Sequence, residues 1–327
     1  MPRSLPRRLR CGCAVAAAAL LALAPAAGAQ QRARACVYAN HRHSTMHRFE
    51  RLVGRPLDCA MVFNNAAPTW SSWERPWFVT HGDANLNWGR WATAPGSSRL
   101  LVISQSLTPD SALGTNWRTL GARGRYDRHF TALARNLVAA GLGRSVIRLA
   151  HEANYGGSKN PVGATRAQQL AWRRFWARAV RVMRRVPGAR FRFDWTVNAA
   201  FEPIPLARIY PGDGVVDIIG VDAYDAGLRT TTGRWHQLAS RPVGIDDVAR
   251  FAARRHKPLS LPEWGLMPRN RRWLGGGDDP AYVAGIDRVL RSRRVAYQAY
   301  FYAGDTAAQL RRSPRALRLV RALYRHR

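Results

Sequence analysis

Two glutamates at the ends of short apolar segments could do chemistry together. Glu152 closes the segment Ser145-Val-Ile-Arg-Leu-Ala-His151, and Glu263 closes the segment Pro258-Leu-Ser-Leu-Pro262. A short apolar run that ends in a carboxylate is typical of a buried strand that delivers an acid to a site. Hydrolysis of a glycosidic bond needs two carboxyl groups, one to protonate the leaving oxygen and one on the other side of the sugar. For either glutamate taken alone, a salt-bridged residue at the rim of a strand is the alternative.

The segments that must position these residues alternate between strand and helix patterns. Apolar strands are predicted at residues 36–39, 58–63, 99–104, 145–152, 191–197, 215–221, 258–262 and 295–302. Helices are predicted at residues 44–53, 127–140, 165–186 and 246–255, with two more beginning at Asp279 and Ser313. Nearly continuous apolar strands that alternate with helices indicate a parallel sheet covered on both faces. Eight of them predict an α/β fold, a (β/α)8 TIM barrel, with one domain over residues 30–327.

In such a barrel the chemistry lies at the carboxyl ends of the strands, where the two glutamates are expected to face each other. Four more hydrogen-bonding side chains fall at predicted strand ends: Asn154, Asn198, Asp222 and Tyr224. We therefore expect these side chains to contribute to substrate binding around Glu152 and Glu263.

The first 29 residues are predicted to be a signal peptide. Arginines crowd residues 3–10, an apolar run follows from Cys11 to Ala24, and Ala27-Gly-Ala29 is a small-residue cleavage site. The apolar run is too short to span a bilayer, and no later stretch is long and apolar enough to do so, so we expect a secreted protein without stable membrane insertion. Export would leave Cys36 and Cys59 as the remaining cysteines, and an oxidising compartment favours a disulfide between them over a metal site.

The formal net charge of +32 does not define a partner by itself. All basic residues except Lys159 and Lys257 are arginine, and the arginines occur in nearly every segment without a long basic block, which indicates a composition bias. Nucleic-acid binding would need a recognition motif besides charge, and none accompanies it. Weak attraction to anionic surfaces remains an expectation.

Other catalytic chemistries find little support in the sequence. The histidines His41, His43, His47 and His151 form no HExxH-like spacing, although a His41-x-His43 pair on a strand end remains open as a metal alternative. A Gly-x-Ser-x-Gly elbow is missing, and Gly275-Gly-Gly277 is not followed by the lysine of a phosphate loop. No metal or cofactor is therefore predicted, and the protein is expected to be a monomer.

Six segments of the chain carry a resemblance to a known family. They are Gly124-Arg-Tyr-Asp127, Arg148-Leu-Ala-His-Glu-Ala-Asn154, Trp195-Thr-Val-Asn198, Tyr210-Pro-Gly-Asp213, Val216-Asp-Ile-Ile-Gly-Val-Asp-Ala-Tyr224 and Pro262-Glu-Trp-Gly265. In order and approximate spacing they resemble glycoside hydrolase family 26, a family rich in β-mannanases, within a clan that has catalytic glutamates on strands four and seven. The resemblance extends from Cys36 to Tyr302.

The resemblance implies roles for individual residues. Glu152 would be the acid/base and Glu263 the nucleophile of a retaining double displacement, with their carboxylates about 5 to 5.5 Å apart. His151 would lie in the sugar subsite, and Tyr224 would be within hydrogen-bonding reach of the nucleophile. Tyr302, at a strand end where related barrels often place a tryptophan, is predicted to bind substrate.

The substrate is less well defined than the reaction. After Glu152, where typical mannanases carry tryptophans, this chain has Tyr155-Gly-Gly-Ser-Lys-Asn160. β-1,4-Mannan is the predicted substrate, with mixed-linkage glucan, xylan or an anionic glycan as alternatives. A secreted barrel that binds glycan without cleaving it is the rival class, and the two intact glutamates count against it.

A tryptophan-rich region is expected to contribute a sugar-stacking platform. It holds Trp70, Trp73, Trp77, Trp88 and Trp91. Together with Trp264 these side chains are predicted to line an open groove, because an aromatic ring offers an apolar face to a sugar. The alternative is that they cover the flank of the barrel.

Overall fold

The structure is a computed structural model that describes Met1 and residues 33–199, 203–230 and 232–325. Apart from Met1, the predicted signal peptide lies outside the described residues. Residues 31–327 form one compact unit that contains the barrel. Among the helices of the described residues, none combines the length and the apolar character that a membrane span requires.

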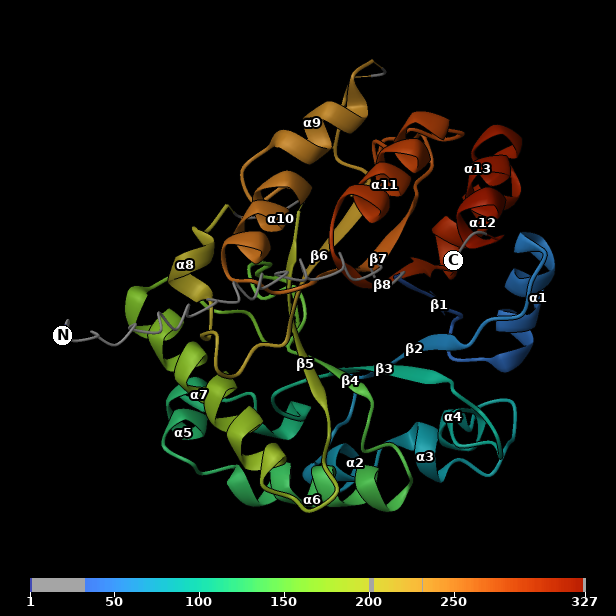
Figure 1. Cartoon of the computed structure of the whole chain (residues 1–327). Helices are drawn as coiled ribbons and strands as arrows, with labels where there is room; N and C mark the ends of the chain where they lie inside the picture. The colour runs from blue at the N-terminus through green and yellow to red at the C-terminus, as the bar shows by residue number, and fades with distance from the viewer. Residues whose placement is uncertain (2–32, 200–202, 231, 326–327) are drawn as a thin grey trace. The chain divides into compact units, whose positions relative to one another are not determined.

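Eight parallel strands close into a barrel in which each strand pairs with its neighbours in sequence and β8 pairs with β1 (Figure 1). Their bounds are β1 Arg34–Tyr38, β2 Cys59–Asn64, β3 Leu100–Gln105, β4 Val146–Leu149, β5 Arg192–Asn198, β6 Ile218–Asp225, β7 Leu259–Leu266 and β8 Val295–Phe301. The predicted (β/α)8 fold is confirmed. Each strand is almost wholly buried because helices cover the outer face and side chains fill the interior.

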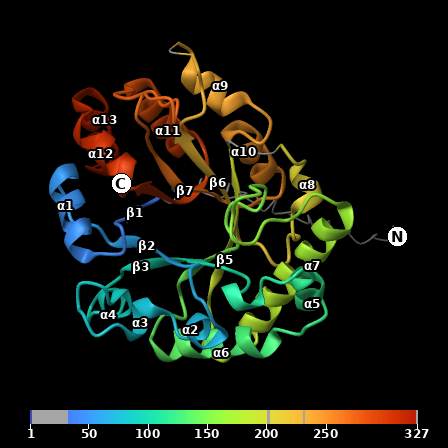
Figure 2. The same ribbon diagram turned by 180° about the vertical axis from the view of Figure 1, so that it is seen from behind.

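Helices surround the strands, as Figures 1 and 2 show. Their bounds are α1 His43–Val53, α2 Trp70–Glu74, α3 Trp77–Thr80, α4 Trp88–Ala92, α5 Trp117–Ala122, α6 Asp127–Ala139, α7 Arg166–Arg184, α8 Leu206–Ile209, α9 Arg234–Ser240, α10 Ile245–Arg254, α11 Pro280–Ser292, α12 Gly304–Arg311 and α13 Pro314–Arg325, with a 3-10 turn at Asp110–Ala112. Short helices α2, α3 and α4 fill the segment between β2 and β3 in which the tryptophans cluster.

Helix α7 illustrates how the sequence places a strand that carries the site. Thr165 and Gln168 form a capping box at its start, which satisfies backbone N–H groups that the first turn leaves unpaired. Its buried face includes Trp172 and Trp176. The Trp176 Nε1–H donates a hydrogen bond of 2.9 Å to the carbonyl oxygen of Leu149, the last residue of β4. The helix therefore fixes the end of the strand that precedes Glu152.

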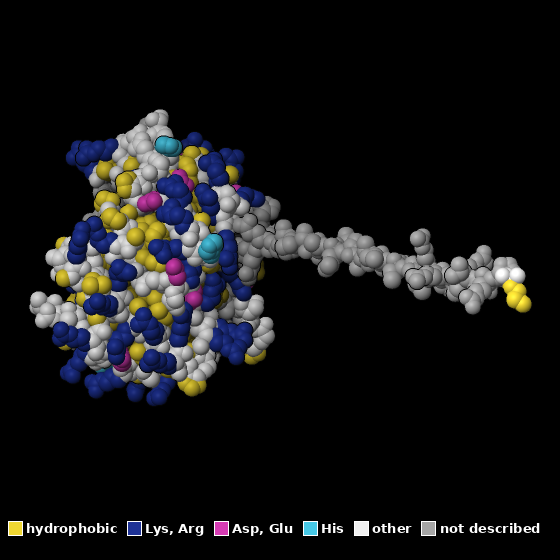
Figure 3. All heavy atoms as spheres, turned by 60° about the vertical axis from the view of Figure 1, so that its left-hand side comes forward, with side chains coloured by type: hydrophobic (Ala, Val, Ile, Leu, Met, Phe, Trp, Pro, Cys, Tyr) yellow, Lys and Arg dark blue, Asp and Glu magenta, His cyan; other side chains and the backbone are white. Residues whose placement is uncertain are grey.

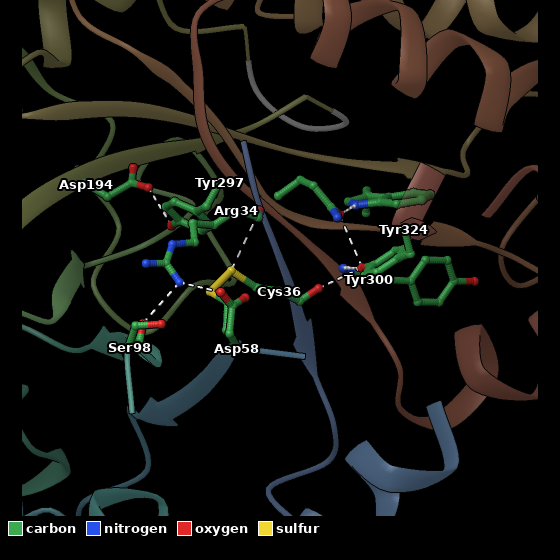
Figure 4. Close-up of a disulfide and its surroundings, with 11 residues drawn as sticks. Arg34, Cys36, Asp58, Ser98, Asp194, Tyr297, Tyr300 and Tyr324 are labelled. Atoms are coloured by element: carbon green, nitrogen blue, oxygen red, sulfur yellow. Dashed lines mark hydrogen bonds and ion pairs between the residues drawn. A yellow bond between two sulfur atoms is a disulfide. The ribbon is translucent and has the colours of Figure 1, made fainter. Parts of the chain in front are cut away.

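The predicted disulfide is confirmed between Cys36 on β1 and Cys59 on β2 (Figure 4), with a Cα–Cα distance of 4.3 Å. Beside it, Arg34 pairs with Asp58, with Nη1 and Oδ2 2.6 Å apart. A covalent link and an ion pair thus join neighbouring strands. By the chain-entropy estimate such a disulfide contributes about 3 kcal/mol.

Two strand boundaries differ from the prediction at the glutamates themselves. Strand β4 ends at Leu149, three positions before Glu152, whereas β7 continues to Leu266, beyond Glu263. In the segment after β4, Ala150 and Glu152 have positive φ angles of 50° and 53°, which take the chain out of the extended conformation. Pro262 was predicted to end the strand. Proline has no N–H group to donate to the ladder, but β7 continues through it.

Candidate active site

Glu152 lies on a tight turn above β4 that the neighbouring strands hold in place. Left-handed backbone at a non-glycine residue is uncommon and persists only where surrounding contacts impose it. Here the N–H of Ala150 donates to the Gln105 carbonyl of β3 at 2.8 Å, and the N–H of Ala153 donates to the Thr196 carbonyl of β5 at 3.3 Å. These two bonds tie the turn that carries Glu152 to both β3 and β5.

Asn198, the last residue of β5, orients Glu152. Its Nδ2–H donates a short hydrogen bond to Oε1 of Glu152. Asn154 clamps the backbone of Asn198: Nδ2 of Asn154 donates to the Asn198 carbonyl at 2.9 Å, and Oδ1 of Asn154 accepts from the Asn198 N–H at 2.8 Å. Both asparagines were predicted to contact substrate. The structure places Asn154 in a buried position where it positions Asn198, which in turn contacts the acid.

Glu263 is positioned by an irregularity in β7. In the pairing with β6, Gly220 pairs with Ser260 and Ala223 with Trp264, so β7 has one residue more than β6 between these pairs. In the pairing with β8, β7 likewise has one residue more than β8 between Leu261 and Trp264. The bulge therefore includes Pro262 and Glu263, where the proline has no N–H to give to a ladder. A bulge of this kind redirects a side chain, and the Glu263 carboxylate meets Arg148 and Tyr224.

Arg148, on β4, links the carboxylates of two other strands, β6 and β7. Its Nη1 donates to Oε1 of Glu263 at 2.5 Å, and its Nη2 donates a short hydrogen bond to Oδ2 of Asp222. Further hydrogen bonds run from Nη1 to the Ser104 hydroxyl at 3.0 Å and from Nε to the Thr196 hydroxyl at 3.2 Å. The guanidinium is fully buried. Burial would lower its pKa, but the charges of Asp222 and Glu263 raise that pKa above its ordinary value.

Tyr224, on β6, completes the setting of Glu263. Its hydroxyl donates to Oε2 of Glu263 at 2.6 Å, so the two oxygens of this carboxylate have different donors. Burial, followed by the charge of Glu263, keeps the pKa of Tyr224 well above its ordinary value, and the hydroxyl therefore stays a donor. The hydrogen bond that the family resemblance implied is present.

The same residue type meets a different electrostatic environment at Glu152. Burial and the nearby charge of Glu263 raise the pKa of Glu152 to about 7, against the opposing effects of the Asn198 hydrogen bond and Arg148. Glu152 thus keeps a proton near neutral pH, as a general acid must. Asp222 is fully buried, and burial raises its pKa despite Arg148.

The carboxyl groups of Glu152, Asp222 and Glu263 converge, with one oxygen of each lying within 4.8 Å of the others. Such a group could in principle ligate a cation. Two of its members already accept hydrogen bonds from the Arg148 guanidinium, however, which supplies the positive charge at this point. The spacing of Glu152 and Glu263 suits an acid and a nucleophile that act on one anomeric carbon.

Aromatic side chains that the sequence interpretation did not single out form a wall beside the carboxylates. Phe63 contacts Tyr38, His151 and Phe301, with ring centroids 4.9, 5.3 and 6.3 Å apart. Phe301 in turn lies 5.9 Å from the ring of Tyr224. The signal that could have identified Phe63 and Phe301 is their place at the carboxyl ends of β2 and β8, where side chains reach the barrel mouth.

Two residues predicted to bind substrate are buried in the outer layer instead. Trp264 is fully buried and donates from Nε1 to Oε1 of Gln298 at 2.6 Å, and Tyr302 packs on Phe49 of α1 with centroids 5.0 Å apart. Successive strand residues point to opposite faces, so the neighbour of an inward Glu263 turns outward. Neither side chain has a face free for a sugar in this structure.

Most tryptophans of the predicted stacking platform are buried as well. Trp73, Trp88 and Trp91 are buried in the hydrophobic core, and Trp70 and Trp77 are partly buried against it. Trp70 stacks on His129 with centroids 3.8 Å apart. Most of these side chains therefore cover the barrel flank, which was the alternative interpretation.

The residues of the metal alternative are likewise placed among aromatic rings. His41 lies against Trp77, and His43 lies against Trp88, with centroids 4.8 and 4.3 Å apart. Burial lowers the pKa of both imidazoles to about 4. Their rings pack against different tryptophans, and neither belongs to the carboxyl cluster of the site.

The fold and site define an eight-stranded barrel with two converging glutamates, one just after β4 and one within β7. Comparison with known families gives a match to glycosyl hydrolase family 26 over residues 134–259, which includes Glu152, Asn198 and Tyr224 and ends just before Glu263. The match covers less than half of the chain and agrees with the family resemblance seen in the sequence. No curated protein matches the chain.

Solved structures with this fold include mannanases and proteins of family 26. A Bacillus subtilis mannanase, BCman, has 14% identity and a TM-score of 0.58, with 88% of this chain and 85% of that chain covered. The β-mannanase BoMan26A from Bacteroides ovatus has 11% identity and a TM-score of 0.59, with 90% of each chain covered. The family 26 domain of an endo-β-mannanase/endo-β-glucanase from Prevotella bryantii has 16% identity and a TM-score of 0.54, with 84% and 85% covered. At these identities the similarity concerns the fold.

Proposed function

We propose that the protein is a retaining glycoside hydrolase that cleaves β-linked polysaccharide, with β-1,4-mannan as the first substrate to test. The observation that carries this proposal is the pair formed by Glu152 and Glu263, with an oxygen of each within 4.8 Å of the other and with different hydrogen-bond donors. Retaining enzymes have carboxyl groups about 5 to 5.5 Å apart, whereas inverting enzymes need about 6.5 to 9.5 Å to admit a water.

In the first step, Glu263 attacks the anomeric carbon while Glu152 gives its proton to the departing glycosidic oxygen. The bond between that carbon and oxygen breaks, and a glycosyl ester forms with the Glu263 carboxylate. Arg148 and Tyr224 hold the Glu263 carboxylate in position, each by one oxygen. When Glu263 becomes a neutral ester, its negative charge is lost. The pKa of Glu152 then falls, because the charge of Glu263 is one of the causes that raise it.

In the second step, Glu152 acts as a base. Having lost its proton, it accepts one from a water, and the water oxygen replaces Glu263 at the anomeric carbon. The free sugar leaves, Glu263 regains its charge, and Glu152 is again protonated. Asn198 stays hydrogen-bonded to Glu152 and keeps it aimed at the same side of the carbon.

The proposed location is extracellular. The signal-like pattern of residues 1–29 supports export, and the Cys36–Cys59 disulfide is typical of an oxidising compartment. A polymeric substrate, too large to enter a cell, agrees with that location.

The experiment is reducing-sugar release from neutral β-mannan, xylan and mixed-linkage glucan. We expect hydrolysis by the native protein, fastest on mannan, and loss of hydrolysis in Glu263→Gln. Binding of these polymers without any hydrolysis would instead support a glycan-binding barrel.

A further inference from the structure

A pocket lies at the carboxyl end of the barrel between the loops that follow β6 and β7. It has a volume of about 340 Å³, and its lining includes Arg229, Arg234, Arg269 and Arg271. We call it the rim pocket. Its lining contains four arginines and no acidic residue. The arrangement therefore offers positive charge without a built-in counter-charge on its surface.

Arg234 stabilises the wall of the rim pocket. This nearly buried side chain pairs with Asp225, with Nη2 and Oδ1 2.7 Å apart, and donates to the Leu228 and Leu274 carbonyls at 2.8 and 3.1 Å. The other Asp225 oxygen accepts from the N–H of Gly276 at 2.9 Å. One buried ion pair thus ties both loops together, so the rim pocket is formed before any ligand arrives.

The other three arginines remain available to a ligand. Arg229, Arg269 and Arg271 are exposed, and none of them forms an ion pair within the described residues. Arg269 donates one hydrogen bond, from Nη2 to the Gly276 carbonyl at 3.0 Å. A planar guanidinium binds carboxylate or sulfate oxygens through paired N–H groups, and weak hydration makes it suited to this task.

The rim pocket follows the candidate active site closely along the chain. Arg229 follows Tyr224 by five residues, and Arg269 follows Glu263 by six. Since a chain spans at most about 3.6 Å per residue, the backbone of Arg229 lies within roughly 18 Å of Tyr224, and that of Arg269 within roughly 22 Å of Glu263. An oligosaccharide bound across the site could reach this distance.

Arginine abundance alone does not distinguish the rim pocket. Figure 3 shows Lys and Arg side chains across the whole visible face. A second pocket, near the amino ends of β1, β3 and β4, is also lined by three arginines, Arg34, Arg99 and Arg144. There Arg34 is paired with Asp58, and the pocket lies at the end of the barrel opposite the catalytic residues. It provides a matched control for nonspecific attraction.

We propose that the rim pocket binds an anionic group, a carboxylate or a sulfate ester, carried by a glycan that is bound in the active site. The natural substrate is then an acidic β-glycan. This inference rests on the proposed function and assigns Arg229, Arg269 and Arg271 as specificity residues.

The test compares neutral polysaccharides with their charged derivatives. Mannan, xylan and mixed-linkage glucan are each used in neutral, carboxymethylated and sulfated form. The native protein should have a lower KM for a charged form than for its neutral parent, and the charged form with the lower KM identifies the group. Equal KM values for neutral and charged forms overturn the proposal.

Two double variants that remove the same charge at opposite ends of the barrel distinguish specific binding from nonspecific attraction. The double variant Arg229→Gln/Arg271→Gln should raise KM on the preferred charged glycan by about tenfold, with kcat and the KM on its neutral parent unchanged. The double control Arg99→Gln/Arg144→Gln removes the same charge from the opposite end and should leave both KM values as in the native protein. An equal rise in both double variants would mean nonspecific attraction and contradict the proposal.

The proposed function and the rim pocket fail separately. If the native protein hydrolyses none of the glycans, the proposed function is wrong, and the same variants are then compared by the dissociation constants for carboxymethylated and sulfated mannan. Weaker binding in Arg229→Gln/Arg271→Gln alone would still support the rim pocket. Unchanged binding in that variant would refute it.

Discussion

The ends of β4 and β7 hold the same residue in two different settings. Glu152 lies beyond its strand on a left-handed turn, accepts a hydrogen bond from Asn198 and has a pKa raised to about 7. Glu263 lies within its strand at a bulge and accepts hydrogen bonds from Arg148 and Tyr224. The difference shows that donors and nearby charge, and not residue type, give the two glutamates different environments, which the proposed mechanism assigns to a proton donor and a nucleophile.

The largest effect should follow removal of the β7 carboxylate. Glu263→Ala has no group to form the glycosyl ester, so we expect hydrolysis to fall by on the order of 10⁴ or more on both polysaccharides and activated aryl glycosides. Initial rates on the two substrate types measure it. A variant that keeps fast release of an activated phenol would exclude Glu263 as nucleophile.

Removal of the β4 carboxyl should be selective. Glu152→Ala should lose about 10² to 10⁴ on natural glycans, where the departing oxygen needs a proton, yet form the glycosyl ester readily from an aryl glycoside whose phenol leaves unprotonated. Azide should then accelerate turnover by replacing water without needing a base, and a glycosyl azide should accumulate. Equal losses on both substrates, without azide rescue, would argue against the acid/base assignment.

The raised pKa of Glu152 also has a consequence for stability. Its folded pKa of about 7 lies above the ordinary 4.5, so the stability it contributes below pH 4.5 is lost as the pH rises through 7. Glu152→Gln, which stays neutral, should therefore be more stable than the native protein at pH 8.5, by up to about 3 kcal/mol, with the difference largest at high pH. Urea unfolding at pH 4 and pH 8.5 measures it. A constant difference across this range would contradict the raised pKa.

The smallest effect should come from the asparagine that orients Glu152. The Asn198 hydrogen bond lowers the pKa of Glu152, so Asn198→Ala should raise that pKa and shift the alkaline limb of kcat/KM to higher pH. The rate at pH 6 should fall by less than about tenfold, the value of one hydrogen bond. Asn154→Ala, which releases the Asn198 backbone, is the matched comparison and should shift the limb in the same direction. A shift of the alkaline limb to lower pH would contradict the conclusion that the Asn198 hydrogen bond lowers the pKa of Glu152.

The sequence predicted the strands and both glutamates because strand propensity and apolar runs are local properties. It placed Glu152 at a strand end, but the turn after Leu149 depends on hydrogen bonds that its N–H groups donate to the carbonyls of Gln105 and Thr196, which no local pattern reveals. The pairing of Arg148 with Glu263 joins residues 115 positions apart. Such contacts arise only when the barrel closes.

Alternation along strands explains the errors among the aromatic residues. Trp264 and Tyr302 were chosen for their type, yet each follows a residue that faces the site, Glu263 and Phe301, and therefore turns toward the helices. Strict use of the two-residue period would have favoured Phe301 over Tyr302. The bulge at Pro262 could not have been foreseen in the same way, because it is defined by the pairing of β7 with both neighbours.

The central claim is that Glu263 and Glu152 act in turn on one anomeric carbon, and stereochemistry tests it most directly. Proton NMR of a β-mannan oligosaccharide, or of whichever β-glycan the native protein cleaves, follows the anomeric proton of the first product before it mutarotates. Two displacements restore the original configuration, so the first product should be the β anomer. An initial α anomer would mean a single displacement and would contradict the assignment of Glu263 as nucleophile and Glu152 as acid/base.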